Sequence, residues 1–281
     1  MLKLRFTLMS TTMLLASLFI LSSCTQDDIQ PTTSEITDDV SAKFEELGFD
    51  VSDLQTVNRK NPITGEMENG YLLENDIMIP NTLFQEMLKS KVAHEGLLGE
   101  QYRTNNLVSS PQTISVIGYT GGSNALDNTM RTALSWAVDN YNALNIGLTF
   151  TLTYGTNYGN KDIVVYKVSG GGGGSAGFPS GGNPYKFVQI QSGTSSYGTN
   201  TTEHVITHEI GHCLGLRHTD YFNRSLSCGS GGNEGDGGVG AVHIPGTPTG
   251  FDANSVMLSC FSASEDGEFG SYDVTALNYL Y

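Results

Sequence analysis

Basic residues are scarce in this 281-residue chain, which holds 14 Lys and Arg against 29 Asp and Glu, for a net charge of −15. A protein that binds nucleic acid needs a basic face to neutralise phosphates, so this balance excludes nucleic acid as a partner. Proline is scarce too, with 8 residues against 34 Gly. The chain should therefore contain many loops and turns around the core that its 38% hydrophobic residues can build.

Long apolar runs are missing except at the N-terminus, where Lys3 and Arg5 precede a run that ends at Leu21. This pattern predicts a signal peptide over residues 1–23. The run ends in LSSC, which resembles the bacterial lipobox, and the resemblance implies that Cys24 becomes a lipidated N-terminus in the bacterial outer membrane. The following TQDD resembles the export tag of surface-exposed lipoproteins of the Bacteroidetes. An ordinary signal peptide with an incidental cysteine is the alternative.

Cysteine is also rare, and only Cys213, Cys228 and Cys260 remain beyond Cys24. An odd number in an exported protein suggests one pair and one buried thiol. Cys228 and Cys260 lie in loop-like sequence flanked by Gly and Ser, so we expect these two to form a disulfide. Cys213 lies among apolar residues of a predicted helix and is expected in the core.

The chain divides by composition into a tether, an accessory segment and a larger domain. Residues 24–40 are polar and acidic and predict a tether. Residues 41–107 mix helix and strand patterns and resemble a small prodomain or accessory segment. Residues 108–281 give the order strand, helix, strand, strand, loop, strand, helix, followed by an irregular region and a C-terminal helix. This order predicts an α/β (α+β) fold, with a twisted mixed sheet of about four to five strands packed on the second helix.

Four of the six histidines of the chain fall within HVITHEIGHCLGLRHTD, residues 204–220. His208 and His212 are four residues apart, so on a helix both imidazoles point the same way and can bind one metal ion. Glu209 lies about 100° around that helix, where it can deprotonate a metal-bound water. Gly215 can end the helix, and His218 then completes a three-imidazole set that favours zinc and leaves one position open.

HEIGHCLGLRH fits the H-E-x-x-H-x-x-G-x-x-H signature of the metzincin metallopeptidases, and the chain most resembles the bacterial HEIGH-type (dual-action) members. The resemblance implies a zinc endopeptidase that acts on peptides or proteins, with His208, His212 and His218 as ligands and Glu209 as catalytic base. It also implies a methionine turn below the metal, and Met257, 39 residues after His218, suits that role. A structural Ca²⁺ ion is compatible with the sequence but is not indicated by it. The oligomeric state is left open.

The sequence departs from that family pattern in two places. Some metzincins carry a tyrosine two residues after the turn methionine, but this chain has Ser259 there; Tyr221 or Arg217 could assist instead. No cysteine occurs in residues 25–105, which excludes latency through a cysteine ligand. If residues 41–105 inhibit the enzyme, they must do so sterically or through an acidic ligand such as one in LEND, residues 73–76.

Other features of the sequence receive simpler interpretations. The glycines at 170–174 lack the Gly-Lys-Ser/Thr of a phosphate loop and suggest a flexible rim of the cleft. The strand that contains Phe187, Val188, Gln189 and Ile190 is predicted to be the sheet edge on which a peptide substrate lies. His204 is expected to face solvent. Two further functions remain open: a non-catalytic surface-binding lipoprotein with a zinc-organised fold, or a protein that captures peptides without cleaving them.

Overall fold

The computed structural model describes residues 36–281 apart from 48, 90–100, 236–239 and 249. Residues Thr33–Tyr281 form one compact unit. The predicted signal peptide, Cys24 and residues 24–35 of the predicted tether lie outside the described residues. The last residues of that tether are partly helical, because Thr37 caps a helix that begins at Asp38 by accepting a hydrogen bond from the Val40 amide.

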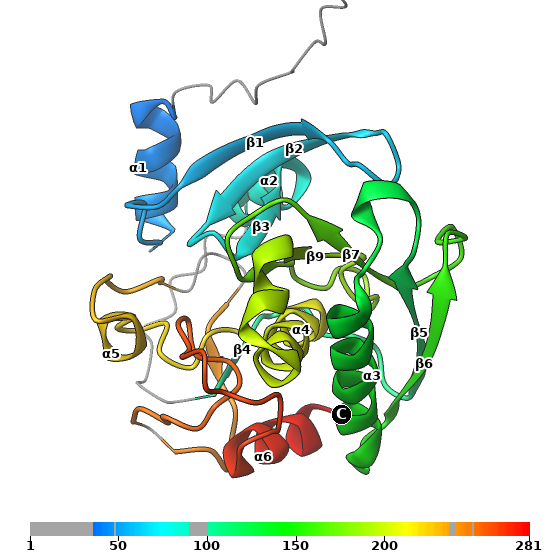
Figure 1. Cartoon of the computed structure of the whole chain (residues 1–281). Coiled ribbons are helices and arrows are strands. Elements are labelled where there is room, and N and C mark those ends of the chain that lie inside the picture. The colour runs from blue at the N-terminus through cyan, green and yellow to red at the C-terminus, as the bar shows by residue number, and fades with distance from the viewer. Residues whose placement is uncertain (1–35, 48, 90–100, 236–239, 249) are drawn as a thin grey trace, which may run out of the picture. The chain divides into compact units, whose positions relative to one another are not determined.

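The N-terminal segment folds into a three-stranded antiparallel sheet with two helices (Figure 1). In chain order its elements are α1 (Asp38–Glu46), β1 (Gln55–Lys60), β2 (Met67–Leu73), β3 (Ile77–Pro80) and α2 (Asn81–Lys89). Their apolar side chains form a small core separate from that of the rest of the protein, around Phe44, Leu73, Ile79 and Phe84. One residue from the larger part of the chain, Phe178, enters this core.

The larger part is built on a five-stranded mixed sheet in the order β6-β5-β7-β9-β8. The strands are β5 (Gln112–Tyr119), β6 (Leu148–Gly155), β7 (Ile163–Val168), β8 (Gly174–Ser175) and β9 (Phe187–Gln191). All neighbouring pairs are parallel except β8 and β9, which are antiparallel. The mixed α/β fold predicted from the sequence is confirmed.

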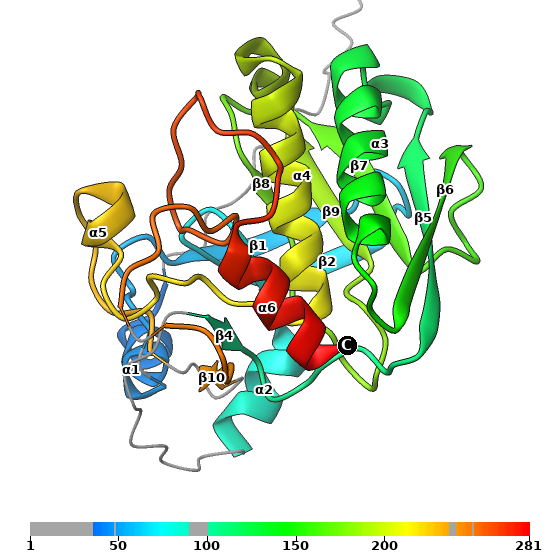
Figure 2. The ribbon, with the colours of Figure 1, turned by 90° about the horizontal axis from the view of Figure 1, so that it is seen from below.

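Two long helices, α3 (Asn128–Ala143) and α4 (Thr199–Leu214), pack against each other beside this sheet (Figure 2). Helix α3 connects β5 to β6, and its apolar face joins the main core between the sheet and α4. In α4 every residue from Thr201 to Leu214 is buried, so this helix is covered on all sides. A helix so enclosed can hold side chains in one fixed geometry.

The C-terminal region wraps around α4 with little regular structure. Its elements are α5 (Ser225–Cys228), β10 (Val242–His243) and α6 (Ser271–Leu280). Three short elements lie earlier in the chain, before α4: β4 (Tyr102–Arg103), η1 (Gly122–Asn124) and η2 (Ser192–Tyr197). Strand β4 pairs with β10, which ties the end of the N-terminal segment to this region. A disulfide joins Cys228 to Cys260, and Cys213 is a buried free thiol.

One strand prediction is wrong. Strand β9 was expected at the sheet edge, but it lies between β7 and β8. The edge is formed by β8, a strand of two residues at the end of the glycine run, which has no hydrophobic alternation to reveal it. Within the described ranges, no helix combines the length and apolar character needed to cross a membrane.

Candidate metal centre

Helix α4 and the turn after it deliver all three histidines of the motif. His208 and His212 lie one turn apart on α4, and Gly215 ends the helix at φ 108°. This left-handed conformation favours glycine. A side chain there would also meet the Asn106 carbonyl oxygen, 2.9 Å from the position of its Cβ. The chain then reverses and brings His218 back beside the helix.

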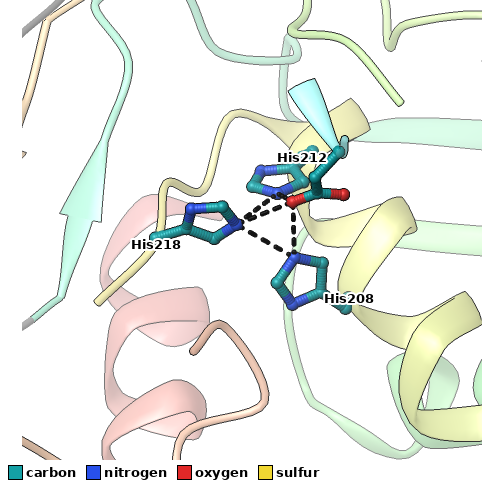
Figure 3. A group of neighbouring side chains, drawn as sticks. His208, His212 and His218 are labelled. Atoms are coloured by element: carbon teal, nitrogen blue, oxygen red, sulfur yellow. Dashed lines mark hydrogen bonds and ion pairs between the residues drawn. The ribbon is translucent and has the colours of Figure 1, made fainter. Parts of the chain in front are cut away.

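The three imidazole rings point to one place (Figure 3). The Nε2 atom of His212 lies 3.2 Å from that of His218, which lies 3.3 Å from that of His208. Bonds of about 2.0–2.1 Å to a tetrahedral ion would place ligand nitrogens about 3.3–3.4 Å apart. The observed spacing is therefore that of ligands around one ion.

Hydrogen bonds at the other ring nitrogen set the tautomers of the ligands. Nδ1 of His208 lies 2.8 Å from the Val256 carbonyl oxygen, and Nδ1 of His212 lies 2.9 Å from that of Leu216. A carbonyl oxygen can only accept, so Nδ1 carries the proton and Nε2 presents its lone pair to the centre. Burial lowers the pKa of His212 to about 4, which keeps this ring neutral. Convergent lone pairs repel one another unless a cation lies between them, so the donor set fits a metal ion.

Met257 is fully buried and packs under α4. A Cβ on Gly211, the residue before His212, would lie 2.5 Å from the Met257 sulfur, so only glycine leaves room for this side chain. The Met257 carbonyl accepts a hydrogen bond of 2.8 Å from the Thr219 amide, next to His218. Met257 thus supports both the helix and the returning chain from below.

A fourth group reaches the centre from the N-terminal segment. Oδ2 of Asp76, between β2 and β3, lies 2.7 Å from Nε2 of His218, 3.1 Å from that of His212 and 3.2 Å from that of His208. Asp76 belongs to the LEND stretch, in which the sequence suggested an acidic ligand. Burial opposes ionisation of Asp76, but its interactions with the rings of His212 and His208 hold the pKa of this carboxyl group well below its usual range.

Glu209 is buried beside the same position. Burial raises its pKa well above the usual value, and the negative charge of Asp76 and a hydrogen bond to that carboxyl add to the effect. A Cβ on Gly174 of β8 would lie 2.6 Å from Oε1 of Glu209, so the sheet edge packs closely on this carboxyl group. Glu209 therefore packs against the sheet edge and lines the same small cavity as Asp76 and His208.

Glu234 is a functional residue that the sequence did not reveal. Its Oε1 lies 2.7 Å from Nδ1 of His218, and its Oε2 lies 3.3 Å from Nη2 of Arg217. All three side chains are inaccessible to solvent. Because Arg217 is buried against Glu234, it cannot contact a substrate, and the suggestion that it assists the reaction there is wrong.

The remaining residues of the motif have structural contacts. His204 was expected to face solvent, but it is buried, with Nδ1 2.9 Å from the Asp266 carbonyl oxygen, and burial lowers its pKa to about 4. Asp220 accepts hydrogen bonds of 2.9 Å from both the amide and the hydroxyl of Ser259. Neither residue belongs to the group of side chains that converges on the centre.

A cleft extends from the centre along the glycine run. A small cavity of about 140 Å³ adjoins Asp76, His208, Glu209 and the glycines at 172–174. A larger cavity of about 700 Å³ continues from Gly171–Gly173 towards Tyr197 and Phe261. The glycine run thus forms one rim of this cleft, with the metal centre at its inner end.

A family of known proteins agrees with this geometry. Residues 71–281 match a family model described as dual-action HEIGH metallo-peptidase. Two solved structures of myroilysin are similar to the chain. One is 13% identical, covers 62% of this chain and 81% of the myroilysin chain, and has a TM-score of 0.39. The other is 14% identical, covers 73% of this chain and 98% of the myroilysin chain, and has a TM-score of 0.40. No curated protein matches the chain.

Proposed function

The chain belongs to the dual-action HEIGH metallopeptidase family, and on that premise we propose that it is a zinc-dependent endopeptidase with Glu209 as its general base. The observation that carries the proposal is the convergence of three imidazole Nε2 atoms beside a buried carboxyl group. Three neutral nitrogen ligands suit zinc, and copper or nickel could compete for them in vitro.

The residues of the chain have separate tasks in this mechanism. When bound, zinc supplies a Lewis acid that polarises the scissile carbonyl and makes water more acidic. Glu209 accepts a proton from the attacking water and delivers it to the leaving amine. Hydrogen bonds at Nδ1 hold each of the three imidazole rings in place. The partners are the carbonyl oxygens of Val256 and Leu216 and the carboxylate of Glu234. Met257 takes the place of the turn methionine that the metzincin resemblance implies.

Ser259 does not replace the tyrosine that some metzincins have at its position. Its hydroxyl lies 2.9 Å from both Asp220 and Glu234, so it is engaged within the protein. We therefore assign no side chain at this position to the charge that develops on the carbonyl oxygen.

Metal removal tests the proposed function. We expect about one zinc per chain and cleavage of an unfolded protein such as reduced casein, with cleavage lost after chelation and restored by zinc. Atomic absorption measures the metal, and mass spectrometry identifies the cut sites. Because the Asp76 carboxylate lies beside all three Nε2 atoms, it could prevent substrate from reaching the metal in the wild-type chain. The same assay is therefore also made on the Asp76→Ala chain. Absence of chelator-sensitive cleavage from both chains would contradict the peptidase function and favour a zinc-organised binding protein.

We further propose that Cys24 carries a lipid that anchors the protein in a bacterial outer membrane, facing the cell surface. The LSSC sequence and the acidic residues that follow it support this location. Expressed in a bacterium, the wild-type chain should fractionate with outer membranes and be accessible to added protease on intact cells, whereas Cys24→Ala should be missing from the outer membrane. Recovery of the Cys24→Ala chain in the outer membrane would contradict lipid anchoring.

A further inference from the structure

The turn between β2 and β3 brings two acidic side chains to His218: Asp76 lies 2.7 Å from its Nε2, at the metal centre, and Glu74 lies 3.4 Å from its Nδ1. Its two central residues, Glu74 and Asn75, both have φ of 60°, and the Asp76 amide donates a hydrogen bond of 3.0 Å to the Leu73 carbonyl. This is the geometry of a tight hairpin turn, in which Gly or Asn is preferred over a longer residue such as Glu. The contacts of Glu74 and Asp76 with the rest of the protein must therefore compensate for an unfavourable backbone.

Asp76 lies at the fourth corner of the ligand set. Its Oδ2 is 2.7–3.2 Å from all three Nε2 atoms, so the four atoms surround a single point. We propose that Asp76 is a fourth protein ligand of the metal and that residues 36–89, which deliver it, hold the peptidase latent. This proposal rests on the proposed function, because it concerns the regulation of the same site.

A four-ligand site leaves no position for the reaction. Catalytic zinc sites have three protein ligands and keep the fourth position for water or substrate, whereas a fourth protein ligand is typical of closed, structural sites. Asp76 and Glu209 line the same small cavity beside His208, so the carboxylate takes up the side of the centre where a water would be held for the base. A substrate must displace Asp76 before the site becomes catalytic.

The strand after Asp76 covers a second part of the cleft. The Met78 amide donates a hydrogen bond of 2.8 Å to the Ala176 carbonyl, and the Ala176 amide donates one of 3.1 Å to the Asp76 carbonyl. Ala176 directly follows β8, the edge strand of the main sheet, and Ile77 pairs with it in parallel. An extended peptide substrate would use the same edge through the same backbone groups. The N-terminal segment therefore occupies both the metal position and the adjacent substrate edge.

Polar side-chain contacts and one apolar residue attach the segment to the rest of the protein. Glu74 lies 3.1 Å from Nε of Arg224, and Arg59 donates a hydrogen bond of 2.8 Å to Gln189. Among the described residues, Phe178 is the one from outside the segment that enters its small core. Because the segment has a core of its own, its withdrawal would leave the main core, with α4 and the three histidines, in place.

Opposite changes in two affinities test this inference on the full chain. We would compare wild type with Asp76→Ala and with Asp76→Asn, which keeps the shape but removes the charged ligand. Asp39→Ala is the control, an exposed aspartate of the same segment that pairs with Lys43 on one face of α1. In the cobalt-substituted proteins, the visible spectrum reports the binding of acetohydroxamate, a small ligand that needs open positions on the metal.

Loss of a ligand should weaken zinc binding about 10- to 100-fold in both Asp76 variants. Acetohydroxamate should nevertheless bind them at least about tenfold more tightly, because it no longer competes with Asp76. Asp39→Ala should match wild type in both affinities. A general loss of structure would weaken both affinities together and would not give these opposite changes.

The outcomes distinguish the proposed block of the metal by Asp76, called the latch below, from the peptidase activity itself. Casein cleavage is measured on the same chains for this purpose. Tighter hydroxamate binding with no cleavage by any chain would support the latch and contradict the peptidase function. Unchanged hydroxamate and zinc affinities in Asp76→Asn, with a wild-type circular dichroism spectrum, would overturn the latch whether or not the chains cleave casein. If Asp76→Ala does not fold, Asp76→Asn alone decides.

Discussion

Replacement of Glu209 by Gln is expected to lower the rate of peptide hydrolysis about 100- to 10,000-fold, because an amide cannot accept the proton of the attacking water. The change should be measured in the Asp76→Ala chain, in which the centre is open, with casein or a peptide found among its cleavage products as substrate. Zinc content and the thermal unfolding midpoint should stay close to those of the parent chain, because Gln keeps the volume of Glu in the packed space beside Gly174.

Glu203→Gln is the matched control for this prediction. Glu203 is a second buried glutamate of α4, and it accepts a hydrogen bond of 2.9 Å from Asn140, away from the metal centre. Burial, with the nearby charges of Glu268 and Asp266, raises its pKa to about 7, so a neutral amide resembles its protonated form. We expect Glu203→Gln to keep the rate of its parent. A Glu209→Gln chain with a rate within about tenfold of the parent would show that another group is the base.

Replacement of Glu234 by Ala is expected to reduce the free energy of unfolding by about 3–5 kcal/mol, because it leaves the guanidinium of Arg217 buried without its carboxylate. Both side chains are fully buried, and the Gly235 and Gly240 carbonyls that also accept from Arg217 carry no compensating charge. Urea unfolding of the zinc-loaded chain measures this effect. Glu66→Ala, at an exposed position of the β1–β2 turn, should change the same free energy by less than about 0.5 kcal/mol.

The same change should weaken zinc binding about 10- to 100-fold, because His218 loses the acceptor that orients its ring. Competition with a chromogenic chelator measures this affinity. Glu234→Gln, which keeps an acceptor oxygen for Nδ1 of His218, should recover part of the zinc affinity but less of the stability, because its amide is neutral. A Glu234→Ala chain with wild-type zinc affinity would contradict the role assigned to Glu234 at the metal centre.

Local sequence patterns were sufficient for the helices, the main strands and the metal-binding motif. The alternating sequence TISVIGY, residues 113–119, and the apolar periodicity from Met130 to Leu144 correspond to β5 and α3. Where the pattern was too short, prediction failed. Strand β8 has two residues and no alternation, so β9 was placed at the edge instead. The predicted C-terminal helix is present and begins at Ser271, with Gly270 as its N-cap.

The position of acidic residues in the metal centre could not be inferred from local pattern. Glu234 follows a run of Gly, Ser and Asn that is typical of a solvent-exposed loop, yet the fold encloses it between Arg217 and His218. Asp76 is one of two acidic residues in LEND, and the sequence did not indicate which of the two would reach the metal. It lies 132 to 142 residues from the three histidines along the chain.

The sequence by itself determined that the chain carries a three-histidine metal site with a neighbouring glutamate, because helical spacing and one helix-ending glycine are enough to bring His208, His212 and His218 together. The tertiary structure alone decided how that site is supported and covered. Glu234 and Asp76 reach the histidines from a loop and a distant hairpin, and only packing of the whole chain determines which buried carboxylate faces which imidazole.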